Sequence, residues 1–406
     1  MITGSGVYNC NCRNIAASGV RLNQPAVKNR NLAMKINAVM RSFTVKMLAA
    51  VAMLYVAAGC STNEAQFPKP LEYYIGNAQP LEGERLPAEY MTKYSFGCFY
   101  TPDGFIGGME LENNKLIHLA DLETGEVIRS AVSRGRGPNE MITGSALQRI
   151  DLCGNNLYAN DIMGEKVLKI SIGPDTLMVG EYFKHQFKGP VFAVNMKAVS
   201  DSLFVFFIGT STGGRLALTD NTGKVVDTLN YPVLEDPLLA TDNQVNFNVS
   251  IALSPCGNWM FVSNYRYNNI RKYHIDGNRI TQVGTYNLTE PRYTIEKGRD
   301  IMENDNVSMN AYLYAGEKYI YMRAVPETLK DYRERLKIEE ASGKTGYAEP
   351  RTHTYIFVFD YEFNLVKSYF VDEWFSNITL TPDPATIYIA DNENHCLVKY
   401  TLPGLE

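Results

Sequence analysis

The chain has 406 residues, of which 45% are hydrophobic and 20% are charged, so its composition is that of a folded protein with a large core. Its net charge of −5 hides an uneven distribution, because the first 59 residues hold seven basic residues and no acidic one. The rest of the chain has 32 basic against 44 acidic residues, a net charge of −12. A body this acidic excludes nucleic acid as a partner, since binding to phosphates needs a basic face.

The N-terminal region divides into two parts. Residues 1–33 are polar and rich in Asn without any helical or strand period, and we expect an unstructured extension upstream of the true start, which is Met1 or Met34. Residues 34–59 contain three basic residues followed by a short apolar run, which is too short to span a bilayer. Small residues then precede Cys60.

This arrangement resembles the bacterial lipoprotein signal. The resemblance implies that Cys60 is acylated and becomes the first residue of the mature protein, which is then bound to a membrane through its lipid. Ser61 in the next position implies the outer membrane, without showing which side of it the protein faces. The other explanation is an ordinary secretory signal with a cysteine nearby by chance. Residues 60–70 are expected to be a tether.

The rest of the chain has many short alternating apolar runs separated by Gly, Asn, Asp and Pro, which is typical of an all-β protein. A unit of strand, turn, strand, polar loop, strand, Asp/Gly turn and strand recurs, mostly at intervals of about 45 to 65 residues. We count six copies, near residues 96–132, 146–183, 194–230, 249–287, 311–370 and 378–403. Four strands per repeat predict a six-bladed β-propeller of antiparallel four-stranded blades.

Two segments depart from the repeat. The last copy ends after its third strand, so we expect an earlier segment, "LEYYIG" at residues 71–76, to supply the missing strand and close the ring. Residues 326–353 form an insertion in the fifth blade that begins with Pro326 and is dense in helix-forming residues. We predict a helix there, which either covers the mouth of the propeller, offers a surface to a partner, or is a charged, solvated excursion.

The stretch "IYIADNENHCLVKYTL" at the last blade is similar to the repeat of NHL-type propellers, and "GRGPNE" at residues 135–140 resembles the link between their blades. Together with the lipoprotein signal, residues 60–406 resemble the TolB-like six-bladed propeller lipoproteins of Bacteroidetes. The resemblance implies the fold. It implies little about function, because the same fold carries unrelated activities.

Loops that join the second and third strands of each blade share one face of a propeller with the links between blades, and this face usually holds the binding site. The ligand-binding candidates in these loops are Asn160, Asp161, Thr210, Ser211, Asn264, Tyr265, Asp391 and Asn392. The link adds Arg134, Arg136, Asn139 and Glu140. Two arginines in a loop held by Gly and Pro could bind a carboxylate, sulfate or phosphate, or they could instead pair with Glu140 and other acids.

A metal role has weaker support. Six-bladed lactonase-like enzymes hold calcium through Glu, Asn and Asp residues, and by resemblance Asp161, Asn264 and Asp391 are the candidates for such a set. The other explanation is that these side chains fix the following turn through hydrogen bonds to the backbone. The sequence has no GxSxG, HExxH or P-loop motif and no zinc-ligand spacing, so we expect no cofactor apart from this calcium alternative.

Two functions remain open. The first is a lipid-anchored binding or scaffold protein of the cell envelope, whose propeller face holds a small anionic or glycan ligand or a protein partner. The second is a calcium-dependent hydrolase or lyase. The sequence favours the first, because it shows no evident nucleophile, base or metal motif.

Overall fold

The computed structural model describes fifteen stretches of the chain, all within one compact unit, Asn63–Glu406. They are residues 64–66, 71–86, 98–108, 114–142, 150–187, 192–210, 213–231, 249–264, 267–296, 299–309, 311–342, 353–372, 375, 377–391 and 396–405. The predicted extension, the signal peptide and Cys60 lie outside these residues.

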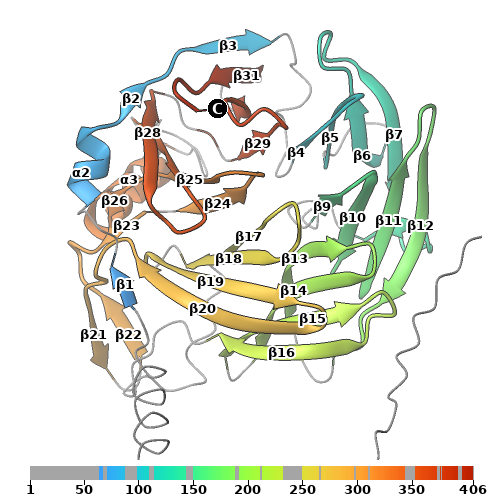
Figure 1. Cartoon of the computed structure of the whole chain (residues 1–406), viewed down its shortest axis with the longest axis horizontal. Coiled ribbons are helices and arrows are strands. Elements are labelled where there is room, and N and C mark those ends of the chain that lie inside the picture. The colour runs from blue at the N-terminus through green and yellow to red at the C-terminus, as the bar shows by residue number, and fades with distance from the viewer. Residues whose placement is uncertain are drawn as a thin grey trace, which may run out of the picture. The chain divides into compact units, whose positions relative to one another are not determined.

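Six antiparallel sheets form a ring, which confirms the predicted all-β, six-bladed propeller (Figure 1). Blade 1 contains β4 (Cys98–Thr101), β5 (Gly104–Gly108), β6 (Lys115–Ala120) and β7 (Val127–Arg134), with β8 (Glu140–Met141) beside β7. Blade 2 contains β9 (Ile150–Cys153), β10 (Asn156–Asp161), β11 (Lys166–Ile172) and β12 (Leu177–Lys184). Blade 3 contains β13 (Phe192–Ser200), β14 (Leu203–Thr210), β15 (Gly213–Asp220) and β16 (Val225–Tyr231).

The other three blades follow the same order. Blade 4 contains β17 (Val249–Leu253), β18 (Trp259–Asn264), β19 (Asn269–Asp276) and β20 (Arg279–Asn287), with β1 (Glu64–Gln66) beside β20. Blade 5 contains β24 (Tyr312–Ala315), β25 (Ile320–Ala324), β27 (Thr354–Phe359) and β28 (Leu365–Val371), with β2 (Gln79–Pro80) beside β28. Blade 6 contains β29 (Ile378–Leu380), β30 (Thr386–Asp391), β31 (Cys396–Thr401) and β3 (Gly83–Leu86).

Aspartates at the start of the turn between the third and fourth strands fix these hairpins. In blade 1, Asp121 Oδ1 accepts hydrogen bonds from the backbone N–H of Glu123 and of Thr124. In blade 3, Asp220 Oδ1 accepts one from the N–H of Thr222. Because Asp side chains mimic a backbone turn in this way, the repeated Asp marks the turn in the sequence.

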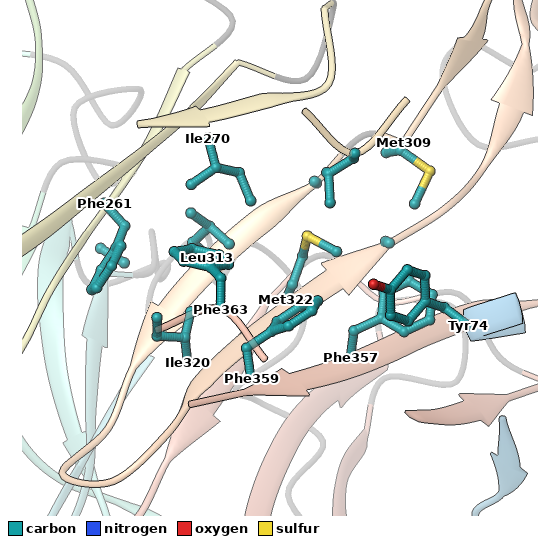
Figure 2. Packing of buried hydrophobic residues seen from close by; sticks show 14 residues of the cluster. Tyr74, Phe261, Ile270, Met309, Leu313, Ile320, Met322, Phe357, Phe359 and Phe363 are labelled. Atoms are coloured by element: carbon teal, nitrogen blue, oxygen red, sulfur yellow. The ribbon is translucent and has the colours of Figure 1, made fainter. Parts of the chain in front are cut away.

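Buried residues from neighbouring blades pack against one another and form most of the core. Figure 2 shows the cluster between blades 4 and 5, where Phe261 and Ile270 of blade 4 lie beside Leu313, Met322 and Phe357 of blade 5. A single four-stranded sheet cannot cover both of its faces, so each blade depends on its neighbours for burial.

Polar contacts between the innermost strands also hold neighbouring blades together. Lys197 Nζ of blade 3 lies 2.7 Å from Asp151 Oδ1 of blade 2, and both side chains are largely buried. Thr379 Oγ1 of blade 6 donates a hydrogen bond to Cys98 O of blade 1 at 3.0 Å, where the last blade meets the first. The ring is therefore closed by hydrogen bonds as well as by packing.

The prediction of a strand at residues 71–76 is wrong. This segment is helix α2 (Leu71–Gly76), which lies on the outer edge of blade 5 (Figure 1). Its Tyr74 is buried against Phe357 and Phe359, with ring centroids 5.9 and 6.3 Å away (Figure 2). A short segment rich in apolar and aromatic residues is compatible with either structure, and here packing of Tyr74 decides for the helix.

A different segment provides the fourth strand of blade 6. β3 pairs antiparallel with β31, with Arg85 opposite Val398. Between α2 and β3, β2 pairs parallel with β28 of blade 5, and β1, within the predicted tether, pairs parallel with β20 of blade 4. The N-terminal residues 64–66 and 71–86 thus cover the outer edges of blades 4 and 5 and complete blade 6. We call them the N-terminal strap.

The predicted insertion contains helix α3 (Leu329–Ser342), between the second and third strands of blade 5. Thr328 caps its N-terminus, because Thr328 Oγ1 accepts a hydrogen bond from Asp331 N at 3.0 Å. Arg335 and Glu327 form a largely buried ion pair at 3.0 Å that ties the helix to β26 (Glu327–Thr328). Most of the other described side chains of α3 are exposed.

Candidate functional site

The alternation of antiparallel strands brings one set of loops to a single end of the blades. Loops between the second and third strands, such as the one after Asp161, lie at the same end as the links between blades. We call this end the loop-bearing face. Lys166, at the start of β11, demonstrates the proximity, because its Nζ donates hydrogen bonds to Gly137 O at 2.5 Å and Pro138 O at 3.4 Å in the link from blade 1.

Two charged residues that are almost inaccessible to solvent hold this link in place through hydrogen bonds. Asp161 is 0% exposed and Lys166 is 5% exposed, and they are partners at the ends of β10 and β11. Asp161 Oδ2 accepts a hydrogen bond from Ile142 N, just after the link, at 3.2 Å, and its Oδ1 accepts one from Gly164 N at 3.1 Å. Both charges therefore satisfy backbone groups of the loop and the link.

Glu140, which is part of the link, also holds it in place through hydrogen bonds to Gly137. Its Oε2 accepts a hydrogen bond from Gly137 N at 2.8 Å, and Gly137 O accepts one from Glu140 N at 3.2 Å. A side chain at Gly135 would clash with this carboxylate, since a Cβ there would lie 2.0 Å from Glu140 Oε2. A larger residue at this position would therefore have to displace the Glu140 carboxylate from its hydrogen bond with the backbone.

Arg134 and Arg136 project from this supported link, and both are exposed. Asn139, in the same link, is exposed as well. No ion pair with Arg136 occurs among the residues that the structure describes. A guanidinium on a loop held by five backbone hydrogen bonds is a preorganised partner for an oxyanion, because the loop need not be ordered on binding.

His185 lies close to the same loop, since its backbone N–H donates to Glu165 O at 2.9 Å. Its ring packs against Phe187 and Phe206 at centroid distances of 5.3 and 5.4 Å, and its Nε2 has no hydrogen-bond partner within the described stretches. Burial in this apolar surrounding lowers the pKa of His185 to about 4. The imidazole is therefore neutral at physiological pH.

On blade 4, Asn264 plays the role that Asp161 plays on blade 2. Asn264 is fully buried, and its Oδ1 accepts a hydrogen bond from Tyr267 N at 3.3 Å, three residues further on. Asp161 and Asn264 thus fix the turns that follow them, as the second explanation of these residues proposed. This use of their oxygens weakens the argument for a calcium set.

Asn268 is a residue that the sequence analysis missed. It is 1% exposed and has a φ of 53°, in the left-handed region that Asn tolerates better than most residues. Its side chain donates to Thr289 Oγ1 at 2.6 Å and to Val307 O, and accepts from Met309 N at 2.8 Å. It therefore joins the loop of blade 4 to the segment leading into blade 5. The pair "NN" directly before a strand was the only signal for it.

Segments on the link between blades 4 and 5 form two further small sheets. They contain the hairpin β21 (Tyr293–Glu296) and β22 (Arg299–Met302), and β23 (Val307–Ser308), which pairs with β26. Tyr267 Oη donates to Asp300 Oδ2 at 2.6 Å and so ties the hairpin to the loop of blade 4. Arg333 of α3 donates to Asn304 Oδ1 at 2.6 Å.

Two buried arginines between blades were also missed. The Arg271 guanidinium lies 4.7 Å from the ring centroid of Tyr231, between blades 3 and 4. Arg323 Nε donates to Phe375 O at 2.7 Å, near blade 6. Each is 2% exposed, so both are structural cations and not surface charges available to a ligand.

The structure describes only some of the remaining sequence candidates. Asn160 is fully buried beside Asp161 and does not face solvent. Thr210 and Asp391 end β14 and β30. Cys60, Ser211, Tyr265 and Asn392 lie outside the described residues.

The described stretches show neither a metal-holding cluster nor a membrane-spanning helix. No group of three or more His, Cys, Asp and Glu side chains there is arranged to hold a metal ion. Among the same residues, no helix has the length and apolar character needed to cross a bilayer.

No family model and no curated protein matches the sequence. Many solved structures are similar, including the following three. A member of the DUF4221 family from Bacteroides vulgatus is 13% identical, with a TM-score of 0.48 over 80% of this chain and 98% of that one. A putative exported protein from Bacteroides fragilis is 12% identical, with a TM-score of 0.47 over 80% and 96%. Regucalcin from Agrobacterium tumefaciens, a calcium-binding protein, is 11% identical, with a TM-score of 0.45 over 81% and 96%. Similarities this low carry no information on ligand or activity, and the fold described above rests on the strand pairing itself.

Proposed function

We propose that the mature protein is a TolB-like or NHL-like propeller lipoprotein, anchored in the outer membrane through a lipid on Cys60. Its loop-bearing face binds a small ligand through an anionic group, the carboxylate, sulfate or phosphate of a glycan. Arg134 and Arg136 are the residues that contact this group. The protein is a binding component of the envelope and not an enzyme.

The observation that carries the proposal is the construction of the link between blades 1 and 2. Lys166, Asp161 and Glu140 are charged groups in or beside this link, and each is engaged by backbone atoms. Arg134 and Arg136 are exposed, and no ion pair between Arg136 and Glu140 occurs among the described residues. The other charged groups form hydrogen bonds with backbone atoms, whereas the guanidinium of Arg136 is exposed to solvent. A fixed loop with an exposed guanidinium suits the recognition of an oxyanion.

Titration calorimetry with a sulfated disaccharide and its unsulfated parent tests the binding site. Replacement of Arg136 by Ala should weaken binding of the sulfated sugar by about 10- to 100-fold, since a hydrogen bond to a charged group contributes about 1.5–3 kcal/mol. Affinity should also fall as salt is raised from about 50 to 500 mM, because exposed charges are screened.

Arg279→Ala is the matched control. Arg279 is also exposed, but it begins β20 at the opposite end of the blades, so its removal changes the net charge equally without touching the face. Equal affinities for the Arg136 and Arg279 variants would rule out the site. The anchor is tested separately: a Cys60→Ser variant should fail to incorporate a labelled fatty acid and should leave the membrane fraction. If the labelling is unchanged, the lipid is not on Cys60.

A further inference from the structure

The N-terminal strap borders a half-open cavity that neither the loop-bearing face nor the anchor explains. It has a volume of 370 Å³ and lies between α2 and β28, on the outer edge of blade 5. Tyr73, Asn77 and Gln79 line it from the strap, and Asn364, Val366 and Lys367 line it from blade 5. Its volume is within the range of small-molecule sites in proteins.

The walls of this cavity are held in place by hydrogen bonds. Ser368 Oγ donates to Tyr74 O at 2.6 Å, which fixes α2 on β28, and Tyr74 itself is buried in the core between blades 4 and 5. Asn77 Nδ2 donates to Tyr73 O at 2.7 Å and so ends the helix. Asn364 Nδ2 donates to Asp360 Oδ2 at 2.8 Å at the other wall. The cavity is therefore formed before a ligand arrives.

The chemistry of the lining is selective. Tyr73 provides an aromatic ring that is 46% exposed at the cavity. The amides of Asn77, Gln79 and Asn364 offer both donors and acceptors, which suits hydroxyl groups. None of the nine described residues that line the cavity is acidic, and Lys367 is basic. The site therefore favours a neutral or negatively charged ligand over a cation.

We propose that this cavity binds one sugar unit, with the sugar ring against Tyr73, the hydroxyl groups at the amides, and a preference for a sugar acid whose carboxylate pairs with Lys367. The site is separate from the loop-bearing face and does not depend on the function proposed for it. It gives the strap a role in binding, besides covering strand edges and completing blade 6.

Titration of the full chain with D-glucuronate and D-glucose, followed by calorimetry or saturation-transfer NMR, tests the proposal. Tyr73→Ala should weaken the binding of both sugars at least tenfold. Tyr332→Ala is the matched control, because Tyr332 is 40% exposed on α3 and does not line the cavity, so its removal should leave affinity within twofold. Lys367→Met should reduce the preference for glucuronate over glucose several-fold.

Val366→Trp provides a second, independent variant, since a bulky side chain at this lining residue fills the cavity without removing a polar group, and it should abolish binding. Equal affinities for the Tyr73 and Tyr332 variants would overturn the proposal, as would the lack of saturable binding by the unmodified chain. D-glucose carries no anionic group for Arg136, so Arg136→Ala should leave glucose binding intact. If this variant instead abolishes glucose binding, the sugar binds on the loop-bearing face and the cavity is not the site.

Discussion

Lys166 is a buried cation whose partners are backbone carbonyl groups, Gly137 O and Pro138 O. A charge in such a place is costly unless its hydrogen bonds are made, so its role is to hold the link and not to meet a ligand. Asp161 does the same for the N–H groups of Ile142 and Gly164. These two residues therefore fix the position of the link that carries the exposed arginines.

Replacing Lys166 by Met keeps the length of the side chain and removes the hydrogen bonds to the link. We expect a loss of unfolding free energy of about 1.5–3 kcal/mol, and weaker binding of a sulfated disaccharide although Lys166 does not reach solvent. Urea denaturation and calorimetry measure the two effects. Lys330→Met, at an exposed position of α3, should change neither. An unaltered affinity in a destabilised Lys166 variant would show that the link is not what positions the arginines.

His185 makes stability depend on pH. Its pKa is about 4 in the folded protein and 6.5 in the unfolded chain, so the unfolded state binds more protons as the pH falls below 6.5. The stability contributed by the neutral ring is present above pH 6.5 and is lost as the pH falls toward 4. Between pH 7 and 5 the loss from this group is about 2 kcal/mol.

A His185→Met variant, which cannot titrate in this range, should lose about 2 kcal/mol less than the unmodified protein between pH 7 and 5. Denaturant melts at both pH values provide the comparison, and carboxylates that titrate in both proteins cancel in it. Identical pH dependences would mean that the ring is accessible to protons in the folded state.

At the scale of secondary-structure elements, the repeat was the part of the fold that the sequence made visible. Asp at the third turn and Gly nearby recur because each blade needs the same tight hairpin, as Asp121 and Asp220 show. The strap could not be predicted in detail, because α2 has no repeat partner and Tyr74 faces a core built by residues about 280 positions away. Arg271, Lys166 and Asn268 were missed for the same reason: their partners come from other loops or blades.

Asn268 forms hydrogen bonds with three segments, and replacing it should weaken the contacts among them. Asn268→Ala removes the hydrogen bonds to Thr289, Val307 and Met309 and places Ala at a φ of 53°. We expect a cost of at least about 3 kcal/mol from unsatisfied buried groups and left-handed backbone together. Asn268→Gly keeps the backbone permissive and should cost less. Hydrogen exchange should speed up at residues 299–309 in both, and a uniform effect over all blades would contradict this local role.

For the whole molecule, the ring depends on closure by β3. A chain that begins at Leu81 keeps β3 and loses α2 and β2, whereas one that begins at Pro87 also loses the fourth strand of blade 6. We expect the second truncation to expose the edge of β31 and to associate or precipitate, since an unpaired edge recruits other strands. Light scattering and thermal melts distinguish the two. Equal behaviour would show that closure rests on the contacts between β29 and β4 alone.

The overall arrangement explains why the candidate binding face is built as it is. The second strands of the blades end on the same face, and the link between blades 1 and 2 is held by Asp161 and Lys166 of blade 2. The exposed arginines therefore stand on a link that is already ordered when the protein folds. From the sequence, the face and its arginines could be proposed because the repeat aligns the loops. The residues that hold the link, Asp161 and Lys166, could not be predicted in this role, because the sequence does not distinguish a buried Lys from any other polar residue in a loop.

The position of a bound anion tests the central claim most directly. A crystal structure of residues 60–406 with a sulfated disaccharide should place the sulfate oxygens about 2.7–2.9 Å from the guanidinium nitrogens of Arg136, with the link from 134 to 141 unchanged. A sulfate held elsewhere on the protein, with Arg136 still in solvent, would contradict the account.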